Sequence, residues 1–298
     1  MIIRHDDPFV PFDREPAEGR ATKGHVPVAV PDEWVPQSSH AARLRVGARN
    51  LDQSVWVSPV DADWAPTLAM KRALVAERPA EVVACLDGAQ EACDEVAMGV
   101  LASLGAPPTD EQGIDALVDT ALRVADDLCI LQEDAAGVPR LTAAVLCSPN
   151  RWRLAEKIGG TMAQIHGPVA RYSSDLDSPV NAMLARLAAG RPVWRINWGI
   201  TDHPSLFQPD VPPQVPGTDP ATMWLRIEWQ TLRRLPVTGA VLFGIRTHLQ
   251  SLADFVAMRP RALVEDFADL ILKLPEDVAS YKSISPHRYA LHEWLTSQ

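Results

Sequence analysis

The sequence lacks any apolar run long enough to span a membrane. None of its 298 residues belongs to a stretch approaching about 18 consecutive apolar residues, the length typical of a transmembrane helix. The segment Met1–Pro8 also lacks the apolar core of a secretory signal peptide. We therefore expect no membrane partner and a cytoplasmic location.

Cysteine is scarce and scattered. The chain has four, with no C-x-x-C pair and none of the closely spaced sets that hold iron–sulfur clusters: Cys85, Cys93, Cys129 and Cys147. We expect free thiols in the core.

Positive charge is in the minority. The 28 Lys and Arg against 38 Asp and Glu give a net charge of −10, and an acidic surface repels nucleic acid. With 47% hydrophobic and 22% charged residues the composition is that of a globular protein, and the chain is long enough to bury a core without disulfides.

The common nucleotide and hydrolase motifs are missing. There is no G-x-G-x-x-G, no Walker loop, no G-x-S-x-G and no H-E-x-x-H. Neither a nucleotide-binding core nor a hydrolase triad has local support.

The N-terminal residues 1–66 are rich in Pro, Asp and Arg and lack periodicity, which predicts an irregular arm. We expect it to pack on the core through its large aromatic side chains: Phe9, Phe12, Trp34, Trp56 and Trp64. The remaining residues, 67–298, are predicted to form a single domain.

The rest of the chain alternates between two periodicities. Helical spacing predicts helices over 67–104, 111–128, 149–166, 175–189, 251–257 and 261–273. Short β-prone runs predict strands over 128–132, 140–147, 193–200, 223–231 and 240–248. The Pro-rich stretch 207–220 is predicted to be a surface loop. This order favours an α+β fold, an antiparallel sheet with helices on one face and an N-terminal helical layer.

Two of the predicted strands alternate cleanly between apolar and polar residues. In 193–200 the tryptophans Trp194 and Trp198 share one face, and Arg195 and Asn197 share the other. In 223–230 the polar face carries Arg226, Glu228 and Gln230.

The segment 147–169 is unusually dense in chemically active residues. Ser148 as N-cap with Pro149 after it predicts a helix start, and the glycines Gly159 and Gly160 predict a break. Thr161 and Gln164 have the spacing of a capping box for a second short helix, which would end at His166.

His166 has two interpretations. It is either a core histidine that caps the last carbonyls of the helix, or a metal or heme ligand whose other ring nitrogen is held by a carboxylate or carbonyl. Residue chemistry alone does not decide between them.

Several blocks in fixed order resemble the heme-dependent oxidative N-demethylase family, which includes dimethylamine monooxygenase subunits. They lie between about residues 110 and 275: Asp126–Leu131, Pro149–Gly159, Ile165–Val169, Gly190–Trp198, Arg226–Pro236 and Thr238–Thr247. The chain departs from the family pattern at Trp229 (expected Arg), at His248 (expected Tyr), at 161–162 (expected Pro-Leu) and at 170–171 (expected Pro-Gly).

The resemblance implies a PAS-like fold that binds a b-type heme (heme b). It makes His166 the axial ligand, with Glu228 accepting the other imidazole N–H. The alternative for Glu228 is a cross-strand salt bridge to Arg195 or Arg246. Four cations are candidates for the heme propionates: Arg153, Lys157, Arg195 and Arg226. Asn197 and His248 are candidates to donate to bound O₂.

Cys147 is a rival axial ligand, since a thiolate supplies the electronic push used by P450 enzymes. Because it ends a β-prone run, we expect a buried thiol instead.

The resemblance also implies a function, the oxygenase component of an oxidative N-demethylase. A small N-methylamine would lose a methyl group as formaldehyde, in a pocket that offers a carboxylate and aromatic faces such as Trp194 or Trp198, where its ammonium would rest by cation–π attraction. Because the chain lacks flavin, nicotinamide and iron–sulfur motifs, electrons would come from a separate NADPH-dependent flavin/iron–sulfur reductase. The alternatives are a non-catalytic PAS-like heme sensor or ligand-binding protein, and an interaction module without heme.

Overall fold

The computed structural model describes residues 30–40, 46–169, 171–211 and 217–298, so Phe9 and Phe12 lie outside the described residues. The described residues form one antiparallel sheet of seven strands in the order β1-β5-β6-β7-β3-β4-β2, which confirms the α+β class. The strands are β1 Arg49–Asn50, β2 Val83–Cys85, β3 Asp127–Glu133, β4 Pro139–Val145, β5 Val193–Thr201, β6 Trp224–Arg234 and β7 Val241–Ser251.

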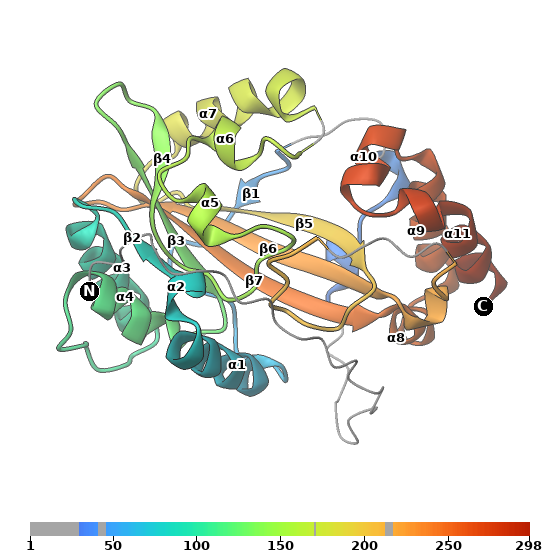
Figure 1. Cartoon of the computed structure of the whole chain (residues 1–298), viewed down its shortest axis with the longest axis horizontal. Coiled ribbons are helices and arrows are strands. Elements are labelled where there is room, and N and C mark those ends of the chain that lie inside the picture. The colour runs from blue at the N-terminus through green and yellow to red at the C-terminus, as the bar shows by residue number, and fades with distance from the viewer. Residues whose placement is uncertain (1–29, 41–45, 170, 212–216) are drawn as a thin grey trace, which may run out of the picture.

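Helices precede, interrupt and follow these strands (Figure 1). They are α1 Trp64–Glu77, α2 Pro79–Val82, α3 Gln90–Ser103, α4 Gly113–Ala121, α5 Leu154–Lys157, α6 Met162–Ile165, α7 Asp177–Arg186, α8 Leu252–Met258, α9 Arg261–Lys273, α10 Glu276–Tyr281 and α11 Arg288–Ser297. A π-helical turn at Tyr172–Leu176 leads into α7. In the parts of the chain that can be described, no helix is long and apolar enough to cross a membrane.

The pairing of β5, β6 and β7 assigns side chains to two faces. Ile227 pairs with Trp198 and His248, whereas Glu228 pairs with Asn197 and Thr247. Successive side chains of a strand point to opposite faces. We call the face that carries Trp198, Ile227 and His248 the α9 face, and the face that carries Asn197 and Glu228 the α6 face.

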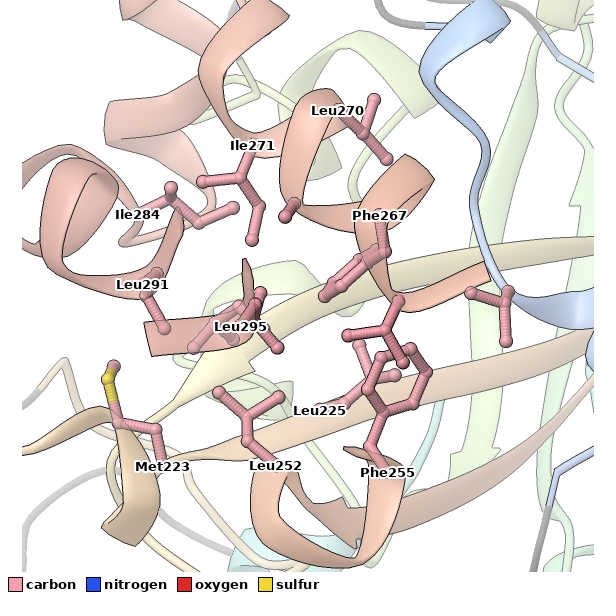
Figure 2. Close-up of a cluster of buried hydrophobic side chains, with 14 of the residues drawn as sticks. Met223, Leu225, Leu252, Phe255, Phe267, Leu270, Ile271, Ile284, Leu291 and Leu295 are labelled. Carbon is pink, nitrogen blue, oxygen red and sulfur yellow. The ribbon is translucent and has the colours of Figure 1, made fainter. Parts of the chain in front are cut away.

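The α9 face is covered at both ends. At one end Phe255 of α8 and Phe267 of α9 are fully buried against Leu225 and Ile227, as Figure 2 shows for part of this cluster. At the other end α1, α3 and α4 pack over Leu128 and other apolar residues of β3 and β4.

The α6 face has its own helical layer. Leu154 of α5, Met162 of α6 and Leu184 of α7 pack over Cys129 and Leu131 of β3. The predicted location of helices on one face only is therefore wrong. Since Leu128 to Leu131 are all buried, β3 presents apolar side chains to both faces, and both need a cover.

The five predicted strands are confirmed within a few residues at each end. Strands β1 and β2 were not predicted, because two or three residues are too few to show alternation. The predicted loop 207–220 does lie between β5 and β6, as far as its residues are described.

The predicted long helices are broken. Pro79 begins α2, and β2 follows it, so 67–104 is not one helix. The predicted helix 111–128 ends at Ala121, before β3 begins. α9 alone matches its prediction at both ends, between Pro260 and Leu274.

The predicted helix start at Ser148 and Pro149 is also wrong. The Asp127 carboxylate accepts hydrogen bonds from the amides of Cys147 (3.0 Å) and Ser148 (2.7 Å), which fixes the chain end of β4 in a non-helical path. Arg151 then has φ 61°, a conformation that no helix allows. The break predicted at the glycines is confirmed, with Gly159 at φ 77° between α5 and α6.

Candidate heme site

His166 is held at the end of α6 by local chemistry. The predicted capping box is present, since the Thr161 hydroxyl accepts from the Gln164 amide and the Gln164 side chain accepts from the Thr161 amide. α6 lasts a single turn and His166 is its C-cap. The His166 Nδ1 lies 2.8 Å from the Met162 carbonyl oxygen.

This hydrogen bond fixes the tautomer of the imidazole. A carbonyl only accepts, so Nδ1 carries the proton and Nε2 carries the lone pair. Burial is the main cause that lowers the pKa of His166, and Lys157 and Arg195 lower it further, so the ring is neutral at pH 7. A neutral imidazole with its Nδ1–H held by a carbonyl is the form that binds a metal through Nε2. Both interpretations of His166 share this bond.

Tyr172 extends the site beside His166. Its ring stacks on the imidazole with 4.5 Å between centroids and 7° between planes. The Tyr172 hydroxyl is buried and has no hydrogen-bond partner among the described residues.

Glu228 is held by three donors from the sheet. Its carboxylate accepts from Asn197 Nδ2 (3.1 Å), Gln230 Nε2 (2.9 Å) and Arg226 Nε (3.3 Å). The predicted hydrogen bond from His166 to Glu228 is wrong, because the protonated ring nitrogen turns back to the carbonyl of Met162. The alternative salt bridge to Arg195 or Arg246 is also replaced, by the pair with Arg226 on the same strand.

The four predicted propionate-binding cations separate into two groups. Arg226 is fully buried and donates to the carbonyls of Ser148 (2.5 Å) and Leu206 (3.2 Å) as well as to Glu228, and Arg153 forms a partly exposed ion pair with Asp210. Both are therefore engaged with protein acceptors.

Lys157 and Arg195 are the two cations whose charges act on His166. The Nε of Arg195 is buried and finds no acceptor among the residues described, and burial lowers the pKa of its guanidinium. These two side chains remain candidates to bind anionic groups, such as heme propionates, beside the imidazole.

Sequence reasoning missed Lys282 and Tyr281 at the end of α10. The Lys282 Nζ donates to the Trp198 carbonyl (2.5 Å) and lies 4.6 Å from the Trp198 ring centroid. The charge of Glu228 acts on both side chains, and burial lowers the pKa of Lys282 to about 8. Both residues follow the last block that carried the resemblance, and nothing in their local pattern marks them.

His248 lies on the opposite face from Asn197. Its ring centroid is 5.7 Å from that of Trp34, and its Nδ1 is 4.0 Å from an Asp61 carboxylate oxygen. Burial and Arg246 lower the pKa of His248 to about 4. Because the sheet separates the two side chains, the prediction that Asn197 and His248 serve one pocket is wrong.

The tryptophans predicted to hold an ammonium beside Glu228 are also on the α9 face. Trp194 and Trp198 alternate with Asn197 on β5, so the sheet lies between them and the carboxylate. Each already has a protein cation at its ring, Arg49 at 5.2 Å from Trp194 and Lys282 at Trp198. The predicted pairing of carboxylate and aromatic faces is therefore wrong.

Cys147 is buried in the cluster under α1–α4, on the side of the sheet away from His166. Burial raises the pKa of this thiol to about 12, which opposes formation of a thiolate. All four cysteines are free, as predicted.

The donor set matches a heme better than a protein-bound metal ion. No group of three or more His, Cys, Asp or Glu side chains suited to a metal ion occurs in the described part of the chain. A b-type heme requires only an axial ligand from the protein and partners for two carboxylates. One imidazole with a lone pair, two unpartnered buried polar atoms and two nearby cations meet those requirements.

These features are typical of a heme-binding α+β protein. A family model described as haem-dependent oxidative N-demethylase, alpha subunit-like, matches residues 104–292, more than half of the chain. The chain belongs to this family. The matched region contains β3–β7 and every residue assigned above to the α6 face.

Proposed function

We propose that the protein is a heme-dependent oxidative N-demethylase that binds heme b on the α6 face, with His166 Nε2 as the axial ligand. The observation that carries this proposal is the hydrogen bond from His166 Nδ1 to the Met162 carbonyl, in a chain that belongs to this family. It presents a neutral imidazole whose Nε2 lone pair is available.

The chain's own residues have distinct tasks in this proposal. Bound heme would supply the chemistry that activates O₂. The carbonyl of Met162, the first residue of α6, accepts the hydrogen bond from the imidazole N–H and raises the electron density of the ring. Asn197, Gln230 and Arg226 hold the Glu228 carboxylate in place on the sheet.

The reaction proposed is removal of one methyl group from a small N-methylamine. The amine, O₂, two electrons and two protons give the demethylated amine, formaldehyde and water. The electrons would come from a separate NADPH-dependent flavin/iron–sulfur reductase, because no redox motif other than the heme site is visible in the sequence.

A PAS-like core within 67–298 is part of the proposal. Support comes from the continuous segment that supplies β3 to β7, with α5, α6 and α7 inserted between β4 and β5. The described part of the arm would pack on this core, as the stacking of Trp34 on Trp229 indicates.

Titration with hemin tests the ligand. We expect one equivalent to give a Soret band in the wild type and in Cys147→Ala, and His166→Ala to lose this band or shift it. If His166→Ala keeps the native spectrum and Cys147→Ala loses it, the axial ligand is the Cys147 sulfur and the assignment of His166 is overturned.

Turnover is tested with heme-loaded protein, a surrogate reductase, NADPH, O₂ and a panel of N-methylamines. We expect formaldehyde above a free-hemin control for at least one amine. A heme-loaded protein that binds CO when reduced but releases no formaldehyde would favour the alternative of a heme sensor.

A further inference from the structure

Two buried polar atoms on the α6 face have no hydrogen-bond partner among the described residues, Arg195 Nε and Tyr172 Oη. Leaving such an atom unsatisfied costs about 1–3 kcal/mol. Tyr172 is only 4% exposed, so ordinary solvent contact does not compensate it. Arg195 lies between Val193 and Asn197 on the α6 face of β5, and Tyr172 belongs to the apolar cluster against which Val193 packs, so both side chains lie on this face.

The same neighbourhood holds more positive than negative charge. Arg226 and Glu228 form an ion pair, and Asp177 is the further carboxylate whose charge acts on His166 and Tyr172, which leaves three other cations against it: Lys157, Arg195 and Lys282. The charge of Glu228 raises the pKa of both Arg195 and Lys282, but burial lowers each pKa by more. Both side chains are half-buried, and partly desolvated cations in excess over carboxylates favour the binding of an anion.

Lys282 reaches this site across the edge of the sheet. β1 pairs with Val193 and Trp194 of β5, and no other strand of the described residues pairs with the following part of β5 on that side. Lys282 occupies that edge and donates to the Trp198 carbonyl. The Lys282 ammonium therefore lies at the edge of β5, and its charge acts on Arg195 and Glu228 of the α6 face.

We propose that Arg195 and Tyr172 form a binding site for a carboxylate group beside His166, with the Lys282 charge at the adjacent edge of β5. A guanidinium and a phenol hydroxyl both donate to a carboxylate, and a nearby ammonium adds attraction. The proposal deepens the proposed function, on which it rests for the identity of the ligand. The carboxylate belongs either to a heme propionate or to a substrate with its own carboxylate, an N-methylated amino acid.

The first arm compares hemin with its dimethyl ester, which lacks both carboxylates. If a propionate occupies the site, the wild type binds hemin at least about tenfold more tightly than the ester, because a charge-assisted hydrogen bond contributes about 1.5–3 kcal/mol. Arg195→Met removes that preference. Arg261→Met, a change in an exposed ion pair with Glu265 on α9, is the matched control and keeps it.

The second arm uses N-methylglycine and dimethylamine, with dissociation constants read from the spectral shift of heme-loaded protein. If the substrate supplies the carboxylate, Arg195→Met weakens N-methylglycine about tenfold or more and leaves dimethylamine unchanged. Tyr172→Phe, which keeps the stacked ring and removes only the hydroxyl, weakens the same ligand by a smaller factor and serves if Arg195→Met does not fold.

The outcomes separate this proposal from the proposed function. The wild type can bind hemin while Arg195→Met and Tyr172→Phe have the same affinities as the wild type for hemin, its dimethyl ester, N-methylglycine and dimethylamine. That result overturns the carboxylate site and leaves the proposed function standing. If the wild type binds no hemin, calorimetric titration of the heme-free protein with propionate and N-methylglycine decides. Binding that Arg195→Met loses supports the site, and absence of binding overturns it.

Discussion

The two faces of the central sheet differ in how their charged and polar side chains are partnered. On the α9 face a terminal guanidinium nitrogen of Arg246 pairs with Asp61 (2.8 Å), although the Arg246 Nε has no partner among the described residues, and the Asp126 carboxylate accepts from the Ser58 hydroxyl (2.6 Å). On the α6 face the Arg195 Nε and the Tyr172 hydroxyl have no partner among the described residues. Charge on the α9 face serves to fasten the arm and α1 to the sheet, whereas charge on the α6 face is available for a ligand.

Two histidines on opposite sides of the sheet, the half-buried His166 and the buried His248, show the same contrast. His166 has its Nδ1 bonded to a carbonyl and lies among cations, whereas the buried Nδ1 of His248 has no hydrogen-bond partner within the described structure and its ring contacts Trp34. Trp229 also stacks on Trp34, with 6.2 Å between ring centroids. The departures from the family pattern at 229 and 248 therefore lie together, and they alter the packing of the arm on the sheet rather than the surroundings of His166.

The largest effect is expected from Arg246→Met. The substitution leaves the Asp61 carboxylate without its buried partner and removes a positive charge that stabilises Asp126. We expect the free energy of unfolding, measured by denaturant titration, to fall by about 3–5 kcal/mol. Hemin affinity of the folded fraction stays unchanged, because the sheet separates Arg246 from His166.

Arg153→Met is the matched control for this prediction. Its ion pair with Asp210 has side chains 34% and 59% exposed, so its loss costs no more than about 1 kcal/mol. Equal destabilisation by the two substitutions, or loss of hemin binding in Arg246→Met alone, contradicts the division of roles between the faces.

The second prediction uses the pKa of His248, about 4 in the folded protein against 6.5 for the free side chain. Between these values the unfolded chain binds a proton that the native protein does not, so stability falls as pH falls from 6.5 to 4. The full loss is about 3 kcal/mol. His248→Gln removes this part of the pH dependence, as measured by denaturant titrations across the range.

His292→Gln, on α11, is the control for that measurement. A stability curve for His248→Gln with the same slope as the wild type between pH 4 and 6.5 shows that His248 is not the group responsible.

Much of the fold was predictable from local patterns. Strands β5 and β6 alternate cleanly, and α9 is bounded by Pro260 and by Leu274 before Pro275, so their ends follow from nearby residues. The sheet order and the covering of both faces could not be predicted from local patterns, because they depend on pairing between distant strands. The break after β4 depends on Asp127, which lies 20 residues before the Cys147 amide that it binds.

The candidate site was predictable only where its chemistry is local. Thr161, Gln164 and His166 form one short motif, and its capping box is confirmed. The distribution of Asn197 and His248 over opposite faces depends on the register of β5 with β6 and β6 with β7, which strand alternation alone does not determine. Lys282 joins the site through a contact between segments 84 residues apart.

The smallest expected effect concerns Asn197, one of the three donors to Glu228. Asn197→Ala removes this hydrogen bond at a half-buried position, and we expect a loss of about 1 kcal/mol in the free energy of unfolding.

Asn197→Asp tests the charge of the face, since it places a second carboxylate beside Glu228. In a balanced environment the repulsion makes this variant less stable than Asn197→Ala. On a face with surplus Arg195 and Lys282 charge it is at least as stable, because the new carboxylate lies among cations. Denaturant titration at pH 7 in heme-free protein distinguishes the two, and an Asn197→Asp variant clearly less stable than Asn197→Ala contradicts the charge surplus on which the comparison of the faces rests.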